Sequence, residues 1–193
     1  MSGTVLLVTA SARHTGSKSS ALGTTLAAGL AKKLELPLVT RDVAALAPIS
    51  EGFVGATFEE PAKRTPEQTQ ALSESDELVA EAQAATVIVL ATPMYNFGPA
   101  AGLKSWADNI ARIGLTFEYS AEGKPVGKLT GKKVFTVVAS GGVPQDAPYD
   151  ALSPWLKAFM PFVGLAADHT VVWQRGDDLA EATAAIDAVL AAK

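Results

Sequence analysis

The amino-acid sequence predicts an α/β fold built on a parallel β-sheet. Short apolar runs alternate with longer segments of helical periodicity five times along the 193 residues, which is the pattern of strands joined by helices. The clearest runs show no polar alternation, as expected where helices cover both faces of a sheet. The length and the 48% hydrophobic content favour one domain over residues 1–193. The predicted strands comprise residues 4–9, 36–40, 86–91, 133–138 and 169–173, of which the second and fifth are weaker.

Two helices are predicted in the first half of the chain. Leucines recur every four positions from Leu22 to Leu34, on one face of a helix that begins near Ser17. The next helix is predicted to begin at residues 65–68, Thr-Pro-Glu-Gln. This tetrapeptide combines an N-cap, a proline at the first helical position and a capping-box glutamine. The apolar face of that helix comprises Leu72, Val79 and Ala82.

Three more helices are predicted in the second half. The first carries an apolar stripe over residues 103–110 and is expected to end with Gly114 as its C-cap. The second carries a stripe over residues 152–162, and Pro161 is expected to end or kink it. The third is expected to be capped by the Asp-Asp pair at residues 177–178.

Two stretches, residues 44–63 and 116–131, are predicted to be irregular. The second carries strand-like Phe117 and Tyr119 and then glycine and proline, which suggests a hairpin excursion. Excursions of this length in a compact domain are usually functional loops.

Composition excludes several classes of function. Without cysteine, the chain has no disulfide, thiolate metal site, iron–sulfur cluster or cysteine nucleophile, and no metal site is predicted. The net charge of −4 argues against nucleic-acid binding, which depends on Lys and Arg. No apolar run approaches the roughly 18 residues of a membrane span. The N-terminus does not read as a signal peptide, so a cytoplasmic location is expected.

The loop after the first predicted strand has the composition of an anion site. Its sequence, SARHTGSKSSALG, contains five hydroxyl side chains, Arg13, His14 and Lys18, and it opens directly into a helix. The N–H groups and the dipole at a helix N-terminus favour a phosphate. A polar surface loop with Ser17 as N-cap is the alternative. The G-x-G-x-x-G fingerprint of dinucleotide sites is absent.

The loops after the third and fourth strands predict a pocket for a flat ligand. Residues 93–98, Pro-Met-Tyr-Asn-Phe-Gly, place two aromatic rings between a strand and a helix. In one interpretation, Pro93 ends the strand, Asn96 caps the helix and the aromatics belong to the core. A planar ligand explains the aromatics better. In the fourth loop, Gly141 and Gly142 either form an ordinary turn or let the backbone approach a ligand.

Taken together, the three loops predict a mononucleotide site. Ligands of open parallel sheets bind outside the carboxyl ends of the strands. A doubly wound five-stranded sheet of order 2-1-3-4-5, with helices on both faces, would bring the three loops together there. Flavin mononucleotide (FMN) fits, with its phosphate on the first helix and its ring between the other two loops.

The segment PMYNFGPAAGLKSWADNIARIGLTFEYSAEGKPVGKLTGKKV resembles the core of the FMN-dependent NAD(P)H azoreductases. These flavodoxin-like enzymes are also described as NAD(P)H:quinone oxidoreductases, and the resemblance spans nearly the whole chain. Relatives often carry arginine before the Gly-Gly pair, where this chain has Ser140, so one cationic contribution is missing. The resemblance implies FMN contacts from Ser11, Ser17, Lys18 and Ser19 at the phosphate, Met94, Tyr95, Asn96 and Phe97 beside the ring, and Ala139, Ser140, Gly141 and Gly142 at its other edge.

The resemblance also implies a reaction. Hydride passes from NAD(P)H through FMN to an acceptor in a ping-pong sequence. Quinones are reduced by two electrons to hydroquinones, and azo compounds are cleaved to amines in two turnovers. The flavin carries the chemistry, so no catalytic residue is assigned. Family members are homodimers with the flavin near the interface, which gives Asn96, Tyr119 and Phe162 roles in binding the substrate.

Two other classes of protein share such a sheet. A flavodoxin-type electron carrier without NAD(P)H oxidase activity is the main alternative, but carriers are strongly acidic around the flavin and the first loop here is locally basic. A phospho-receiver domain needs aspartates after the first and third strands. Those positions hold Ser11-Ala12 and Thr92-Pro93, which argues against a receiver.

Overall fold

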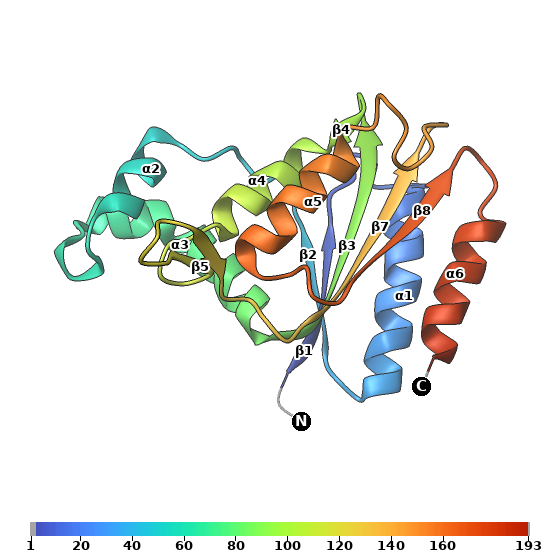
Figure 1. Cartoon of the computed structure of the whole chain (residues 1–193), viewed down its shortest axis with the longest axis horizontal. Coiled ribbons are helices and arrows are strands. Elements are labelled where there is room, and N and C mark those ends of the chain that lie inside the picture. Colours follow the sequence, from blue (N-terminus) through green and yellow to red (C-terminus); the bar gives the residue numbers. More distant parts are fainter. Residues whose placement is uncertain (1–2, 193) are drawn as a thin grey trace.

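Five parallel strands form the centre of the computed structural model, which describes residues 3–192. The strand order β2-β1-β3-β7-β8 corresponds to 2-1-3-4-5 for the five main strands, so the predicted fold class is confirmed (Figure 1). A short sixth strand, β4 (Gly98–Pro99), pairs antiparallel with β3. The main strands are β1 (Thr4–Thr9), β2 (Leu38–Asp42), β3 (Ala85–Tyr95), β7 (Lys133–Ser140) and β8 (His169–Arg175).

Helices cover both faces of this sheet (Figure 1). One face is covered by α1 (Lys18–Leu34) and α6 (Ala180–Ala191), and the other by α3 (Pro66–Ala84), α4 (Ala101–Ile110) and α5 (Leu152–Val163).

The core consists of two apolar layers, one on each face of the sheet. In β1, Leu6 and Val8 pack in the layer beneath α3, α4 and α5, whereas Val5 and Leu7 pack in the layer beneath α1 and α6. Because successive side chains of a strand point to opposite faces, a strand buried on both sides is apolar at every position. This is why the strands lack polar alternation.

The first two predicted helix starts are confirmed. Ser17 is the N-cap of α1, and its hydroxyl accepts a hydrogen bond from the Ser20 N–H. Thr65 caps α3, and both reciprocal bonds of the capping box with Gln68 are present. The predicted hairpin is also confirmed, because β5 (Phe117–Tyr119) and β6 (Pro125–Gly127) pair antiparallel.

The predicted end of α4 at Gly114 is wrong. The C-cap residue is Ala111, because the Thr116 hydroxyl turns the chain at that point. The Thr116 Oγ1 atom accepts from the Arg112 N–H (3.0 Å) and donates to the Ile110 carbonyl (2.5 Å). Gly114 lies in the following turn, with φ 78°.

The last two helices depart from the prediction at their ends. Helix α5 continues through Pro161 to Val163, and Gly164 caps it in the left-handed conformation with φ 92°. Helix α6 begins at Ala180, whose N–H is bound by the Asp178 carboxylate, whereas Asp177 pairs with Lys18 instead.

Residues 44–63 are more regular than predicted. They contain α2 (Glu51–Phe58) and a short 3₁₀ helix, Pro61–Lys63. The Ser50 hydroxyl caps α2 by accepting from the Phe53 N–H. No helix within residues 3–192 is both long enough and apolar enough to cross a bilayer.

Replacement of Gly102 by alanine is expected to destabilise the fold. Gly102 lies in α4, and a Cβ there would overlap the carbonyl group of Val43. Because the obstacle is backbone, we expect Gly102→Ala to lower the free energy of unfolding by about 1–3 kcal/mol in urea denaturation. Gly55→Ala is the matched control, since nothing lies within 4 Å of the added methyl. Equal midpoints for the two variants would contradict this packing.

Candidate functional site

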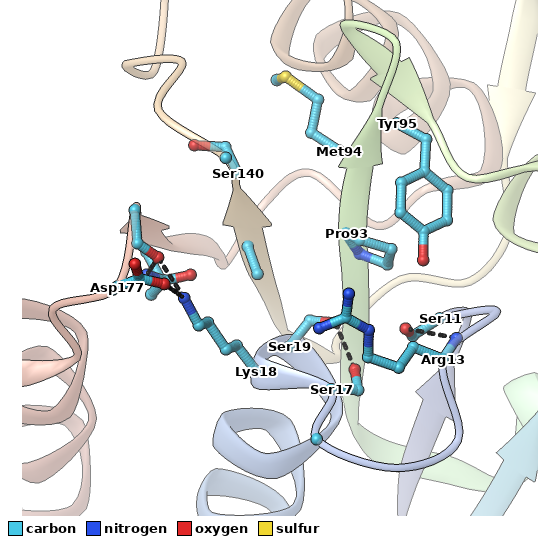
Figure 2. Close-up of a pocket in the computed structure, with 15 residues that line it drawn as sticks. Ser11, Arg13, Ser17, Lys18, Ser19, Pro93, Met94, Tyr95, Ser140 and Asp177 are labelled. Carbon is cyan, nitrogen blue, oxygen red and sulfur yellow. Dashed lines mark hydrogen bonds and ion pairs between the residues drawn. The ribbon is translucent and has the colours of Figure 1, made fainter.

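A pocket of about 380 Å³ opens where the parallel strands have their carboxyl ends (Figure 2). Its size is in the range of small-molecule sites. The strand register brings the lining loops together, because Pro93 on β3 lies opposite Ala139 on β7, which lies opposite Gln174 on β8. Nine of the predicted cofactor contacts line it: Ser11, Ser17, Lys18, Ser19, Met94, Tyr95, Ala139, Ser140 and Gly141.

Hydroxyl groups and the N-terminus of α1 form one end of the pocket. Ser19 is buried, and its Oγ lies 3.3 Å from the Oγ of Ser17. Ser11 is also buried, and its Oγ accepts from the N–H of Arg13. The first turn of α1 contains no acidic residue, so its positive dipole end is not neutralised there. This end of the pocket can therefore hold an anion such as phosphate.

Lys18 connects this end to the turn between β8 and α6. Its ammonium donates to the Gly176 carbonyl and to the Asp177 carboxylate, both at 2.5 Å (Figure 2). The Lys18 hydrogen bond lowers the pKa of Asp177 below its usual value. Lys18 thus anchors the neighbouring turn, and its charge is paired with Asp177.

The corner after β3 differs from the prediction. Pro93 does not end the strand, which continues to Tyr95 and pairs with β4 through Met94↔Pro99 and Tyr95↔Gly98. Asn96 and Phe97 form the two-residue turn of this hairpin, with φ 48° and 71°. Both values are positive, as a type I′ turn requires. Asn96 therefore does not cap α4, whose N-cap residue is Ala100.

Phe97 is held in a conformation that bulky residues avoid. Left-handed backbone costs an L-residue about 1–2 kcal/mol, yet the Phe97 side chain is half exposed. Its ring meets Tyr149 edge-on, with centroids 5.6 Å apart, and its carbonyl accepts from the Ala151 N–H at 2.9 Å. Backbone strain of this kind is concentrated at functional sites.

Asp150 fixes the segment whose Ala151 N–H binds the strained turn. Its buried carboxylate accepts hydrogen bonds from the N–H groups of Asp146, Leu152 and Ser153 at 2.9–3.0 Å. Burial alone would raise the pKa of Asp150, but these hydrogen bonds outweigh it and lower the pKa. The carboxylate thereby fixes the start of α5 next to Ala151, the partner of Phe97.

The loop after β7 forms the opposite wall. Ser140 is buried, and its hydroxyl donates to the Val143 carbonyl at 2.7 Å. The indole N–H of Trp173 donates to the same carbonyl at 2.9 Å. These two bonds hold the loop that carries Gly141 against the sheet.

Some predicted contacts do not line the pocket. Asn96, Phe97 and Gly142 are chain neighbours of lining residues, but are not part of its wall. Tyr119 and Phe162 lie at the hairpin, where both rings pack on Phe117 with centroids 5.7 and 4.4 Å away. This hairpin is at the far end of α5 from the carboxyl edge of the sheet (Figure 1), so within one chain these two rings are not at the pocket.

Other lining residues were not predicted. The predicted site does not include the loop after the fifth strand, although this loop also begins at the carboxyl edge of the sheet, where sites form. Within residues 3–192 no cluster of three metal-ligating side chains is present. The lining residues outside the predicted cofactor contacts are Arg13, Gly16, Pro93, Gln174, Gly176 and Asp177, of which Arg13 and Gly16 belong to the predicted anion-binding loop.

Comparison with known proteins places this pocket in a family. A sequence model of a protein family with a flavodoxin-like fold matches residues 3–192. The chain is 45% identical over 166 residues to FMN-dependent NADH:quinone oxidoreductase 2 of Rhizobium etli, covering 83% of this chain and 81% of the relative. The chain belongs to this flavodoxin-like family. The resemblance in the sequence is thereby confirmed.

Solved structures of the family share the architecture. The azoreductase of Bacillus anthracis superposes with a TM-score of 0.83 at 25% identity, with 97% of each chain covered. An FMN-dependent NADH-azoreductase from the same species, solved in complex with FMN, superposes with a TM-score of 0.79 at 20% identity, also over 97% of each chain.

Asp150→Ala is expected to destabilise the protein in a pH-dependent way. The variant loses a helix-cap interaction, so its free energy of unfolding at neutral pH should fall by about 1–2 kcal/mol. Because the folded state lowers the pKa of Asp150, its stabilisation is present above the unfolded pKa of about 3.9 and is lost as the pH falls through the folded pKa.

Urea denaturation at neutral and acidic pH tests this expectation. The difference between wild type and Asp150→Ala should shrink towards acidic pH, and Asp150→Asn, which keeps an acceptor oxygen, should lie between them at neutral pH. A difference independent of pH would exclude the carboxylate as its origin.

Proposed function

We propose that this chain is an FMN-dependent oxidoreductase that uses NADH to reduce quinones. The observation that carries the proposal is the pocket itself, which joins a hydroxyl-lined helix N-terminus to an aromatic hairpin at one edge of the sheet. A phosphate fits the first part and a flat ring fits the second. Three relatives at 40–45% identity are named FMN-dependent NADH:quinone oxidoreductases, which supports the same choice.

The lining residues and their chain neighbours Asn96, Phe97 and Gly142 divide between the parts of the cofactor. Ser11, Ser17 and Ser19 would donate to the phosphate together with the first N–H groups of α1, and Lys18 would contribute its charge. Met94 to Phe97 would border one side of the ring, and Ala139 to Gly142 the other. Backbone N–H groups of Asn96, Phe97, Gly141 and Gly142 are candidates to stabilise negative charge on the reduced ring.

FMN, when bound, supplies the redox chemistry by accepting hydride from NADH and passing two electrons to the acceptor. The residues of the chain would orient the ring and would leave one face open to donor and acceptor. If donor and acceptor use that face in turn, the kinetics are ping-pong. A quinone would become a hydroquinone, and an azo compound would be cleaved to amines in two turnovers, as the names of the structural neighbours suggest. A cytoplasmic location, where NADH is produced, is part of the same proposal.

The chain is further proposed to act as a homodimer. The rings of Phe97 and Tyr149 beside the pocket are half exposed, and so is that of Tyr119 at the hairpin. Exposed apolar groups in two places favour a surface that another molecule covers. In a twofold dimer, Tyr119 and Phe162 of one copy would cover the pocket of the other and contact the substrate together with Asn96.

Removal of one pocket hydroxyl tests the cofactor assignment. Wild-type protein is expected to bind FMN and to oxidise NADH with benzoquinone. Ser19→Ala should weaken FMN binding by about 10- to 150-fold, since a hydrogen bond to a charged group contributes about 1.5–3 kcal/mol, and should leave riboflavin binding unchanged. Ser73→Ala, on the exposed surface of α3, is the matched control for both flavins.

The measurement is quenching of flavin fluorescence, followed by NADH consumption. FMN binding without any NADH turnover would favour the electron-carrier alternative. Failure of the wild type to bind FMN would reject the proposal.

Mixing two variants, at an FMN concentration that saturates only the wild-type pocket, tests the shared site. A pocket variant, Ser17→Ala with Ser19→Ala, keeps its covering residues, and a cover variant, Tyr119→Ala with Phe162→Ala, keeps its pocket. In a hybrid twofold dimer one of the two sites is intact.

Co-refolding the two variants at equal ratio should therefore restore about a quarter of the wild-type NADH–quinone activity, because half of the dimers are hybrids. Each variant refolded alone is the control. A monomer in analytical ultracentrifugation, or no recovery on mixing, would reject the dimer.

A further inference from the structure

Gln174 is a buried amide in the wall of the pocket that the function described above does not use. It lies near the carboxyl end of β8, and only 1% of its surface is exposed. Val172, two residues earlier, packs in the layer beneath α1 and α6, so the alternation of the strand places Gln174 on the same face. The amide therefore lies on the side of the N-terminus of α1, where the hydroxyl groups gather.

Only one half of this amide is paired. Its Nε2 donates to the Gly176 carbonyl at 2.7 Å and to the Asp178 carbonyl at 3.4 Å. Its Oε1 is buried and has no hydrogen-bond partner among the described residues. The amide cannot be turned over to remedy this, because both partners of Nε2 are carbonyls and can only accept.

An unpaired buried oxygen has a cost that needs an explanation. Leaving a buried acceptor without a donor costs about 1–3 kcal/mol. Lys18 does not relieve it, since its ammonium donates to the Gly176 carbonyl and to Asp177. Because Gln174 lines the pocket, a ligand bound there is the candidate donor.

The groups of FMN differ in their ability to donate a hydrogen bond to Gln174 Oε1. Phosphate oxygens at neutral pH are chiefly acceptors, so the phosphate is a poor partner for Oε1. The ring N–H of a flavin is a donor, but the ring is assigned to the corner at Tyr95. A hydroxyl on the chain between phosphate and ring is the donor that remains on this side of the pocket.

We propose that Gln174 is a further cofactor-binding residue, whose Oε1 accepts a hydrogen bond from a hydroxyl of the ribityl chain. This inference rests on the proposed function, because it takes FMN as the ligand. It implies a division of recognition, in which Ser19 recognises the phosphate and Gln174 recognises the sugar alcohol.

Three flavins separate the two contacts. FMN has both the phosphate and the ribityl chain, riboflavin lacks the phosphate, and lumiflavin lacks both. We expect Gln174→Leu to weaken FMN and riboflavin alike, by about tenfold, as for one lost hydrogen bond, and to leave lumiflavin unchanged. Ser19→Ala should weaken FMN alone. Gln70→Leu, on the exposed side of α3, is the matched control for the same substitution.

A change in the ligand tests the contact without relying on the variant's fold. FMN analogues that each lack one ribityl hydroxyl are titrated into apoprotein by fluorescence quenching. Wild type should bind one of these analogues about tenfold more weakly than FMN. Gln174→Leu should bind that analogue and FMN with equal affinity, because the variant has already lost the partner of the missing hydroxyl and the two losses are not additive.

The outcomes distinguish this inference from the proposed function. If wild type binds FMN but Gln174→Leu binds FMN and riboflavin equally well, the Gln174 contact is rejected and the function stands. Equal weakening of all three flavins, lumiflavin included, would also reject it, because that result indicates a general loss of structure. A wild type that does not bind FMN overturns both proposals.

Discussion

The register between the central strands β3 and β7 determines where every part of the pocket lies. Pro93 faces Ala139 across these strands, and Ala139 faces Gln174 on β8. Both faces of the strands are buried in separate apolar layers. A slip by one residue would exchange the side chains of the two layers, so packing strongly specifies the register. The carboxyl ends of the strands are thereby aligned at one edge, and the loops that follow them must meet there.

The turn at Asn96 and Phe97 is stabilised by tertiary contacts, although the backbone conformation it requires is unfavourable for Phe97. The turn at Asn96 and Phe97 is left-handed at both residues, which Asn tolerates and Phe does not. Three contacts compensate this strain: the pairing with β4, the edge-on ring contact with Tyr149, and the hydrogen bond from the Ala151 N–H. Since a strained turn persists only when its neighbours over-determine it, the half-exposed ring of Phe97 is presented in a defined position before any ligand arrives.

Features set by neighbouring residues, such as helix caps, were predicted from the sequence. Features set by residues distant in the sequence were missed. The capping box at Thr65 and the N-cap Ser17 act within one helical turn, so the sequence around them suffices. The end of α4 depends instead on the Thr116 hydroxyl, six residues beyond the last helical carbonyl. The type I′ turn lacks the glycine that usually marks it. Loop composition indicated which three loops form the pocket and the family resemblance indicated most of their lining residues, but Gln174 became visible only when β8 was placed beside β7.

The turn after β8 and the start of α1 behave as one unit because they share an acceptor. The Gly176 carbonyl accepts from Lys18 on α1 and from Gln174 on β8, so a shift of either side chain changes the bond of the other. Asp177 adds a negative charge beside Lys18 in a chain of net charge −4. An incoming phosphate therefore meets one cation, Lys18, that is already partly compensated, while Arg13 also lines the pocket. The hydroxyls, the helix N–H groups and the amide of Gln174 add directed hydrogen bonds to the charge at this end of the pocket.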